Sequence, residues 1–149
     1  MKTNKKIQSI LRNYESDNIT TLKNLNKIFM SGSLSGTGKL IILPVDQGFE
    51  HGPDRSFAIN PEAYDPHYHF KLGIDAGMSA FAAPLGMLEA GADTFKNKIP
   101  LILKCNSSNS LTKSADQAIT GSVSEAKRLK CSAVGFTIYP GSDNIFEMI

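Results

Sequence analysis

The chain has 149 residues, of which 41% are hydrophobic and 20% charged, and its formal net charge is +2. This length provides enough material for one domain with a hydrophobic core. The near balance of 16 basic and 14 acidic residues argues against a nucleic-acid partner. No apolar segment follows the basic N-terminus, so neither a signal peptide nor a membrane span is expected. The composition therefore predicts a globular protein of the cytoplasm.

The first thirty residues predict two short helices. Apolar side chains recur every three or four positions over residues 7–14 and again over residues 22–29. Thr20 or Thr21 is expected to cap the second helix. Residues 31–38 are rich in Gly and Ser, which predicts either a linker or a loop packed under the next element.

Beyond residue 38, apolar runs alternate with segments suited to helices. The expected strands are 40–45, 78–82, 99–104 and 133–138. The expected helices are 65–77, 85–98 and 122–130. In the first of these, Asp65 is expected to cap the helix, Pro66 to begin it and Gly77 to end it. This order predicts strand–helix units on a parallel sheet.

Four such units can begin either a doubly wound sheet or a (β/α)₈ barrel. No GxGxxG motif follows the first strand, which argues against dinucleotide binding. Polar residues follow the strands instead, namely Asp46, Lys104, Asn106 and Tyr139, and barrel enzymes build their sites at that end. A complete barrel takes about 250 residues, so we expect the N-terminal half of a TIM barrel. The predicted organisation is a helical extension (1–30), a Gly/Ser-rich linker (31–38) and the first half of the barrel (39–149).

Asp46 and Lys104 are the best candidates for chemistry. Asp46 directly follows an apolar strand, where it could hold a substrate hydroxyl or an ammonium group, or could simply cap the next turn. Lys104 ends an apolar strand, and burial would make it nucleophilic, so the residues alone nominate it as an imine-forming lysine. The alternative is a lysine with a buried stem and a solvated head group.

Other candidates are weaker. His51 is close to two glycines that allow a ligand to approach the backbone, but it could equally be a loop histidine bonded to backbone. Glu50 beside it could be only a loop charge. Residues 33–40 depart from the P-loop pattern and precede a strand, and His67 and His69 are spaced wrongly for chelation on one helix. Cys105 and Cys131 are expected to be buried free thiols.

Three segments resemble one family. Residues 43–53 (LPVDQGFEHGP) resemble the class I fructose-bisphosphate aldolases of the archaeal and bacterial DhnA-like type. Residues 133–142 (AVGFTIYPGS) and 99–104 (IPLILK) with Asn106 are similar to two further signatures of that family. The resemblance implies a TIM barrel that reversibly cleaves fructose 1,6-bisphosphate into dihydroxyacetone phosphate and glyceraldehyde 3-phosphate, in glycolysis and gluconeogenesis. It implies neither a metal nor another cofactor.

The resemblance also implies residue roles. In the family a lysine on the sixth strand forms a Schiff base with the substrate, a tyrosine on the fifth transfers protons, and phosphate loops follow the seventh and eighth. None of these strands is expected in this chain, which is therefore predicted to be inactive alone. Asp46 matches an active-site aspartate, and Lys104 becomes a supporting cation rather than the Schiff-base lysine. His51 and Tyr139 are expected to contact substrate.

Two alternatives remain at this point. One is a related Schiff-base barrel lyase that acts on another phosphorylated sugar. The other is a non-catalytic half-barrel that binds a partner. The expected partners are a phosphorylated sugar, the missing C-terminal barrel half and, in the full-length family, further copies of the protein; nucleic acid and membrane are not expected.

Overall fold

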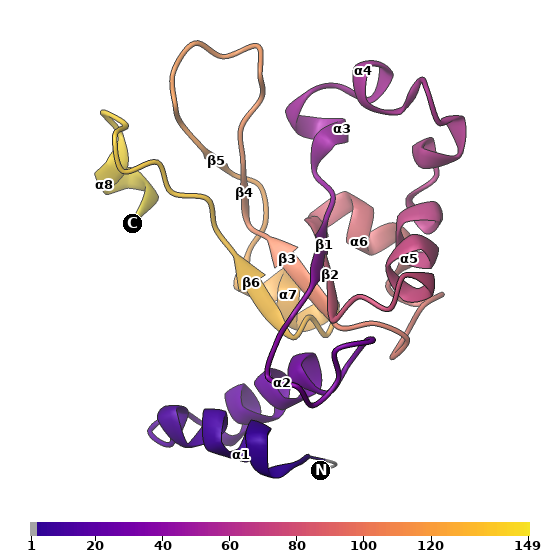
Figure 1. The fold of residues 1–149 in the computed structure, drawn as a ribbon. Helices are drawn as coiled ribbons and strands as arrows, with labels where there is room; N and C mark the ends of the chain where they lie inside the picture. The colour runs from indigo at the N-terminus through magenta and orange to yellow at the C-terminus, as the bar shows by residue number, and fades with distance from the viewer. Residues whose placement is uncertain (1–2) are drawn as a thin grey trace.

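The computed structural model describes residues 3–149 and places a four-stranded parallel sheet at the centre (Figure 1). The sheet contains β1 (Ile42–Pro44), β2 (Ala80–Pro84), β3 (Leu101–Lys104) and β6 (Ala133–Gly135), in that spatial order. All neighbouring strands are parallel. The four strands therefore follow one another across the sheet in chain order, as expected for one half of a (β/α)₈ barrel. The predicted α/β class and the predicted strands are confirmed.

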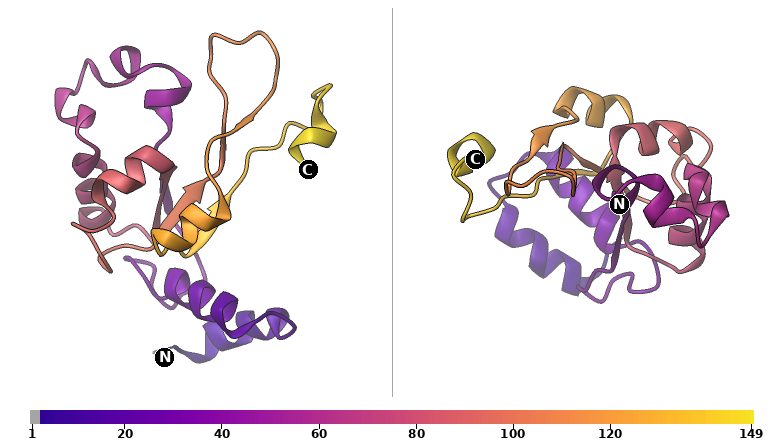
Figure 2. Two further views of the ribbon diagram at one scale, coloured as in Figure 1. Left: turned by 180° about the vertical axis from the view of Figure 1, so that it is seen from behind. Right: turned by 90° about the horizontal axis from the view of Figure 1, so that it is seen from above.

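The helices connect and flank these strands. They are α1 (Lys5–Leu11), α2 (Ile19–Phe29), α3 (Gln47–Glu50), α4 (Pro53–Phe57), α5 (Pro66–Asp75), α6 (Leu85–Gly91), α7 (Val123–Arg128) and α8 (Ile145–Met148). Two 3₁₀ turns span Arg12–Tyr14 and Pro61–Tyr64. In Figure 1 the sheet is viewed from the face that these helices leave open, and the left view of Figure 2 shows α6 and α7 across its other face. None of the helices in residues 3–149 is long and apolar enough to cross a membrane.

The ends of the helices follow local capping chemistry. Asp65 accepts a hydrogen bond of 2.9 Å from the His67 N–H, Pro66 begins α5, and Gly77 follows the helix at φ +67°, all as predicted. The prediction that Thr20 or Thr21 caps α2 is wrong. Asn18 is the cap, and its side chain accepts hydrogen bonds from both threonine N–H groups.

Most predicted elements are shorter in the structure; the strand expected over 40–45, for example, spans Ile42–Pro44. The helix expected over 85–98 ends at Gly91, and residues 92–98 continue as turns, with Asn97 in the left-handed conformation at φ 61°. The strand expected over 133–138 ends at Gly135, because its neighbour β3 leaves the sheet after Lys104. A small antiparallel pair, β4 (Asn106–Ser107) with β5 (Ala118–Ile119), follows β3 and was not predicted.

The Gly/Ser-rich segment 31–38 packs against the start of β2. The Ser33 N–H donates a hydrogen bond of 2.7 Å to the Gly77 carbonyl. Gly32 has φ +72°, and a Cβ at this position would come within 2.3 Å of the Gly77 oxygen. Only glycine therefore fits at Gly32. The segment is thus packed, as in the second alternative, but against the turn before β2 and not under the strand that follows it in the chain.

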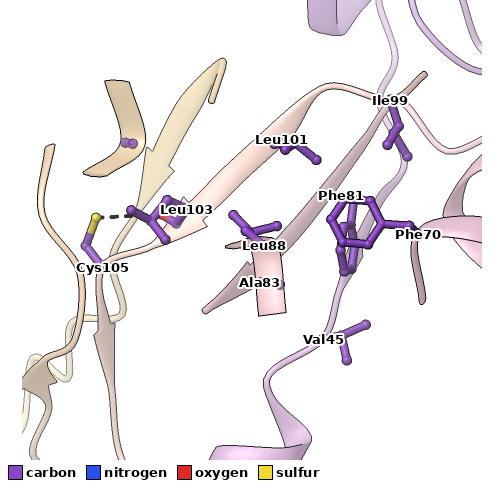
Figure 3. Close-up of a cluster of buried hydrophobic side chains, with 10 residues drawn as sticks. Val45, Phe70, Phe81, Ala83, Leu88, Ile99, Leu101, Leu103 and Cys105 are labelled. Atoms are coloured by element: carbon purple, nitrogen blue, oxygen red, sulfur yellow. Dashed lines mark hydrogen bonds between the residues drawn. The ribbon is translucent and has the colours of Figure 1, made fainter. Parts of the chain in front are cut away.

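The hydrophobic core lies between the sheet and α5, α6 and α7 (Figure 3). Its buried members are Val45, Phe70, Phe81, Ala83, Leu88, Ile99, Leu101, Leu103, Cys105 and Ala126. The Phe70 and Phe81 rings are fully buried and pack edge to face, with centroids 4.8 Å apart. Cys105 and Cys131 are both free thiols; Cys105 is buried and Cys131 half-buried. Burial raises the pKa of both thiols, that of Cys131 to about 11, so neither is activated as a nucleophile.

The opposite face of the sheet is covered by no helix among residues 3–149 (Figure 1). The strand register places Pro44, Ala82, Ile102, Lys104 and Gly135 on this open face. These residues alternate with the core side chains, because successive side chains of a strand point to opposite faces. The open face corresponds to the interior of a barrel.

Candidate active site

An ion pair between Lys104 and Asp46 lies at the carboxyl end of the sheet. Asp46 follows β1 and is the first residue before α3, whereas Lys104 is the last residue of β3. Since parallel strands present their carboxyl ends on one side, residues 58 positions apart in the chain meet here. The Lys104 ammonium donates a hydrogen bond to an Asp46 carboxylate oxygen. The predicted proximity of these two residues is confirmed.

Glu50 adds a second carboxylate to this pair. The one-turn helix α3 forms because the Asp46 carbonyl accepts hydrogen bonds of 3.0 Å from the N–H groups of Phe49 and Glu50. The turn brings Glu50 Oε1 to 3.8 Å from Lys104 Nζ. The side chains of Lys104, Asp46 and Glu50 are 15%, 21% and 23% exposed, so solvent screens their interactions only partly. The sequence offered little reason to choose Glu50, because nothing in it predicted α3.

A pocket of about 210 Å³ opens beside the ion pair on the open face of the sheet. Asp46, Lys104 and Thr137 supply its polar groups. The other side chains that line it are apolar or small: Pro44, Val45, Ala82, Ile102, Gly135 and Phe136. A concave apolar site with a few convergent polar groups is the usual form of a small-molecule site. The Lys104 cation can attract a phosphoryl group, and the Asp46 carboxylate can accept a hydrogen bond from a hydroxyl.

His51 and Tyr139 line a neighbouring pocket of about 240 Å³, together with Glu50 and the loop 108–115. His51 Nε2 lies 4.0 Å from Glu50 Oε2, and the His51 side chain is 44% exposed. The Tyr139 hydroxyl accepts a hydrogen bond of 3.0 Å from Gln117. The structure thus brings His51 and Tyr139 together, and Glu50 lies between them and the Lys104–Asp46 pair. The sequence did not predict Gln117 as a site residue, because only the fold of the β4–β5 loop brings it next to Tyr139.

The loop between β4 and β5 is fixed to the loop after β1. The Ser110 N–H donates to the Glu50 carbonyl at 2.7 Å, and Asn109 Nδ2 donates to the Phe49 carbonyl at 2.8 Å. At its base the N–H groups of Thr120 and Gly121 share the Cys105 carbonyl, at 2.8 and 3.0 Å. These bonds tie a long polar segment to the carboxyl end of the sheet, where the two pockets open.

A third pocket, of about 190 Å³, lies at the opposite end of the strands and is lined by basic side chains. Lys27, Arg128 and Lys130 are in or next to the last turns of α2 and α7. Cations at helix C-termini compensate the partial negative charge of the carbonyl groups there. Arg128 is also paired with Glu89. We assign this pocket to helix packing.

The histidines of α5 do not form a pair. His67 Nε2 bonds to the Ala90 carbonyl and His69 Nε2 to the Ala63 carbonyl, each at 2.8 Å. This agrees with the rejection of a chelating pair. Within residues 3–149, no three His, Cys, Asp or Glu side chains are grouped so that they could hold a metal ion.

Comparisons with known proteins place this chain in a family. Residues 40–149 match the family model described as DeoC/LacD family aldolase. The chain belongs to the DeoC/LacD aldolase family. A probable fructose-bisphosphate aldolase class 1 of Chlamydia trachomatis is 42% identical over 138 residues, which are 91% of this chain and 40% of that protein. A fructose-bisphosphate aldolase class 1 of Thermoproteus tenax is 43% identical over 112 residues, 74% of this chain and 41% of that protein.

Solved structures agree with this assignment. A Schiff-base-forming fructose-1,6-bisphosphate aldolase superposes with a TM-score of 0.70 at 38% identity, covering 83% of this chain and 48% of that one. A fructose-bisphosphate aldolase from Slackia heliotrinireducens gives a TM-score of 0.73 over 99% of this chain and 46% of that one, and at 21% identity it supports the fold alone. The chain thus spans about two fifths of its curated relatives and about half of the solved aldolases, and the predicted family is confirmed.

Proposed function

We propose that this aldolase chain supplies the first half of a class I fructose-bisphosphate aldolase site. The complete enzyme would reversibly cleave fructose 1,6-bisphosphate into dihydroxyacetone phosphate and glyceraldehyde 3-phosphate, in glycolysis and gluconeogenesis in the cytoplasm. The observation that carries this proposal is the Lys104–Asp46 ion pair in a pocket at the carboxyl end of a parallel sheet. The names of the relatives from Chlamydia trachomatis and Thermoproteus tenax support the choice of substrate.

Lys104 is assigned the role of a supporting cation. A lysine attacks a ketone only through the lone pair of its neutral amine. Lys104 is instead paired with Asp46 and lies 3.8 Å from Glu50, so its head group is engaged by carboxylates and not free to approach a ketone. Its ammonium can instead hold substrate phosphate or favour the neutral form of a second lysine nearby. We place the Schiff-base lysine outside these 149 residues.

The other site residues are assigned to substrate contacts. Asp46 can accept a hydrogen bond from a substrate hydroxyl in the pocket that it lines. His51 and Tyr139 border the adjoining polar pocket, where an imidazole and a phenol can bind hydroxyl or phosphoryl oxygens. An extended, polyhydroxylated sugar phosphate would then cross from one pocket to the other beside Glu50.

The partner that this proposal requires is the rest of a barrel. β1 and β6 are the outer strands of the sheet, and each pairs on one side only among the described residues. A closed barrel has no such edges and would also cover the open face. The relatives contain further chain of the length needed, because the matched region is only 40% of the Chlamydia trachomatis protein.

The test is reconstitution. We define the completing segment as the part of the Chlamydia trachomatis aldolase that follows its match to this chain. Co-expression of the two pieces should give cleavage of fructose 1,6-bisphosphate in a coupled assay, whereas either piece alone should give none. Asp46→Ala in the co-expressed protein should lower kcat/KM by about 10²-fold or more, as for other groups that contact a reacting substrate. A stable co-expressed complex without activity would contradict the proposal.

One observation favours a second substrate. A relative from Methanocaldococcus jannaschii, 32% identical over 72% of this chain, is named fructose-bisphosphate aldolase/6-deoxy-5-ketofructose 1-phosphate synthase. A family member with a second named activity supports the alternative of a Schiff-base lyase acting on another phosphorylated sugar. The same reconstituted complex should be assayed with other ketose phosphates, and higher kcat/KM for one of them would replace fructose 1,6-bisphosphate as the substrate.

A further inference from the structure

Asn106 lies where the third strand leaves the main sheet. The β3–β6 ladder ends at the pair Lys104–Gly135, followed by a single bond of 2.9 Å from the Cys105 N–H to the Gly135 carbonyl. The next residue, Asn106, belongs to β4 and is paired with Ile119 of β5. The backbone of Asn106 therefore pairs within the small β4–β5 sheet and does not continue the β3–β6 ladder.

The Asn106 side chain forms the two hydrogen bonds to β6 that a continued β3 backbone would have formed. Its Nδ2 donates to the Thr137 carbonyl at 2.8 Å, and its Oδ1 accepts from the Thr137 N–H at 2.8 Å. A side-chain amide carries one acceptor and two donor hydrogens, so it can present to Thr137 the same donor and acceptor as a peptide group. Asn106 is only 1% exposed. Water therefore has little access to replace either bond, and leaving these groups unpaired would be costly.

We infer that Asn106 is a positioning residue for the mouth of the sheet, by which we mean the carboxyl ends of β1, β3 and β6 around the pocket beside Asp46 and Lys104. It fixes the chain beyond β6 so that Thr137 lines the pocket with Asp46 and Lys104. Without it, the strand would be held only as far as Gly135, two residues short of Thr137. The inference rests on the proposed function only for the statement that this mouth is an active site.

The test is amide hydrogen exchange at Thr137 in the 149-residue chain, read from peptides that contain it. In Asn106→Asp, an ionised carboxylate can accept from the Thr137 N–H but has no proton for the Thr137 carbonyl. Because position 106 is buried, the pKa of this carboxyl is raised, and its protonated form at pH 5 has that proton and restores both bonds. Compared with the parent at the same pH, Asn106→Asp should exchange about tenfold faster or more at pH 8, and close to the parent rate at pH 5. Asn106→Ala should exchange faster at both pH values.

Asn109→Asp is the matched control. Asn109 also donates to one backbone carbonyl, of Phe49, and accepts from one N–H, of Leu111, but it is only half-buried and forms neither of these bonds with Thr137. The same charge change there should leave Thr137 at the parent rate.

Parent-like exchange of Thr137 in both Asn106 variants at both pH values would overturn the inference. So would Asn106→Asp without recovery at pH 5, because a protonated carboxyl can form both bonds to Thr137. Exchange requires no turnover, so these results are independent of the substrate. A reconstituted protein without aldolase activity would contradict the proposed function and leave the inference about Thr137 standing.

Discussion

The Lys104 ammonium, at the end of β3, lies close to two carboxylates from the segment after β1, those of Asp46 and Glu50. Among the described residues, Lys104 is the only Lys or Arg within 4 Å of the Asp46 or Glu50 carboxylate. His51 also lies 4.0 Å from Glu50, but it is a cation only when protonated. Removing Lys104 would leave two partly buried negative charges close together. Breaking a buried pair by deleting one partner is more costly than removing both, because the remaining charge stays unpaired.

We therefore predict that Lys104→Met lowers the free energy of unfolding by about 1–3 kcal/mol, and that adding Asp46→Asn recovers part of this loss. Urea unfolding of the co-expressed protein at fixed concentration measures both. Lys113→Met, at an exposed loop position, is the control and should change stability by less than about 0.5 kcal/mol. Equal effects of the two lysine substitutions would show that the ion pair contributes nothing.

The sequence predicted part of this site and not the rest, for a physical reason. Asp46 and Lys104 each directly follow an apolar run, and parallel strands bring such positions together without any further information. The approach of Glu50 depends on α3, a single turn closed by hydrogen bonds to the Asp46 carbonyl. A four-residue helix has no periodicity that a sequence pattern can reveal. The bond from Gln117 to Tyr139 depends in the same way on the β4–β5 loop.

At the scale of elements, the long and strongly patterned segments were predictable. The four strands were found because each is a short apolar run between turn signals, and α5 because Asp65, Pro66 and Gly77 mark its ends. The β4–β5 pair has two residues per strand, Asn106–Ser107 and Ala118–Ile119, and tertiary contacts alone define it. The cap of α2 was misplaced because three neighbouring residues, Asn18, Thr20 and Thr21, are all common cap residues.

The α2 cap provides a prediction at this scale. Asn18 accepts bonds from the N–H groups of Thr20 and Thr21, at 2.9 and 3.0 Å. Asn18→Ala should lower stability by about 1 kcal/mol, measured by urea unfolding under the same conditions. Thr20→Ala and Thr21→Ala are the matched controls and should have smaller effects, since both backbone N–H groups remain capped. A larger loss in either threonine variant would restore the first assignment of the cap.

At the scale of the whole molecule, the largest feature that still lacks a packing partner is the open face of the sheet, together with its two open edges at β1 and β6 in the described residues. Ile41 and Ile42 on the β1 side are 47% and 39% exposed, and Val134 and Phe136 on the β6 side are 40% and 51% exposed. Burying such a side chain is worth roughly 1.5–3 kcal/mol, so a few of them are comparable to the roughly 5–15 kcal/mol of a whole domain. Open, apolar strand edges also promote association between chains.

We therefore predict that the chain alone binds a hydrophobic dye and self-associates, and that the completing segment suppresses both. Dye fluorescence and light scattering with and without co-expression measure this directly. A monomer with a sharp cooperative melt and no dye binding would show that this face needs no partner.

The central claim is that the Schiff-base lysine lies in the completing segment and that Lys104 only supports it. Trapping the imine tests this claim most directly. The chain alone and the co-expressed protein are incubated with dihydroxyacetone phosphate, reduced with borohydride and analysed by mass spectrometry. The account predicts no added mass on the 149-residue chain in either sample and an adduct on a lysine of the completing segment. An adduct mapped to Lys104 would contradict it, because Lys104 would then be the nucleophile and not the supporting cation.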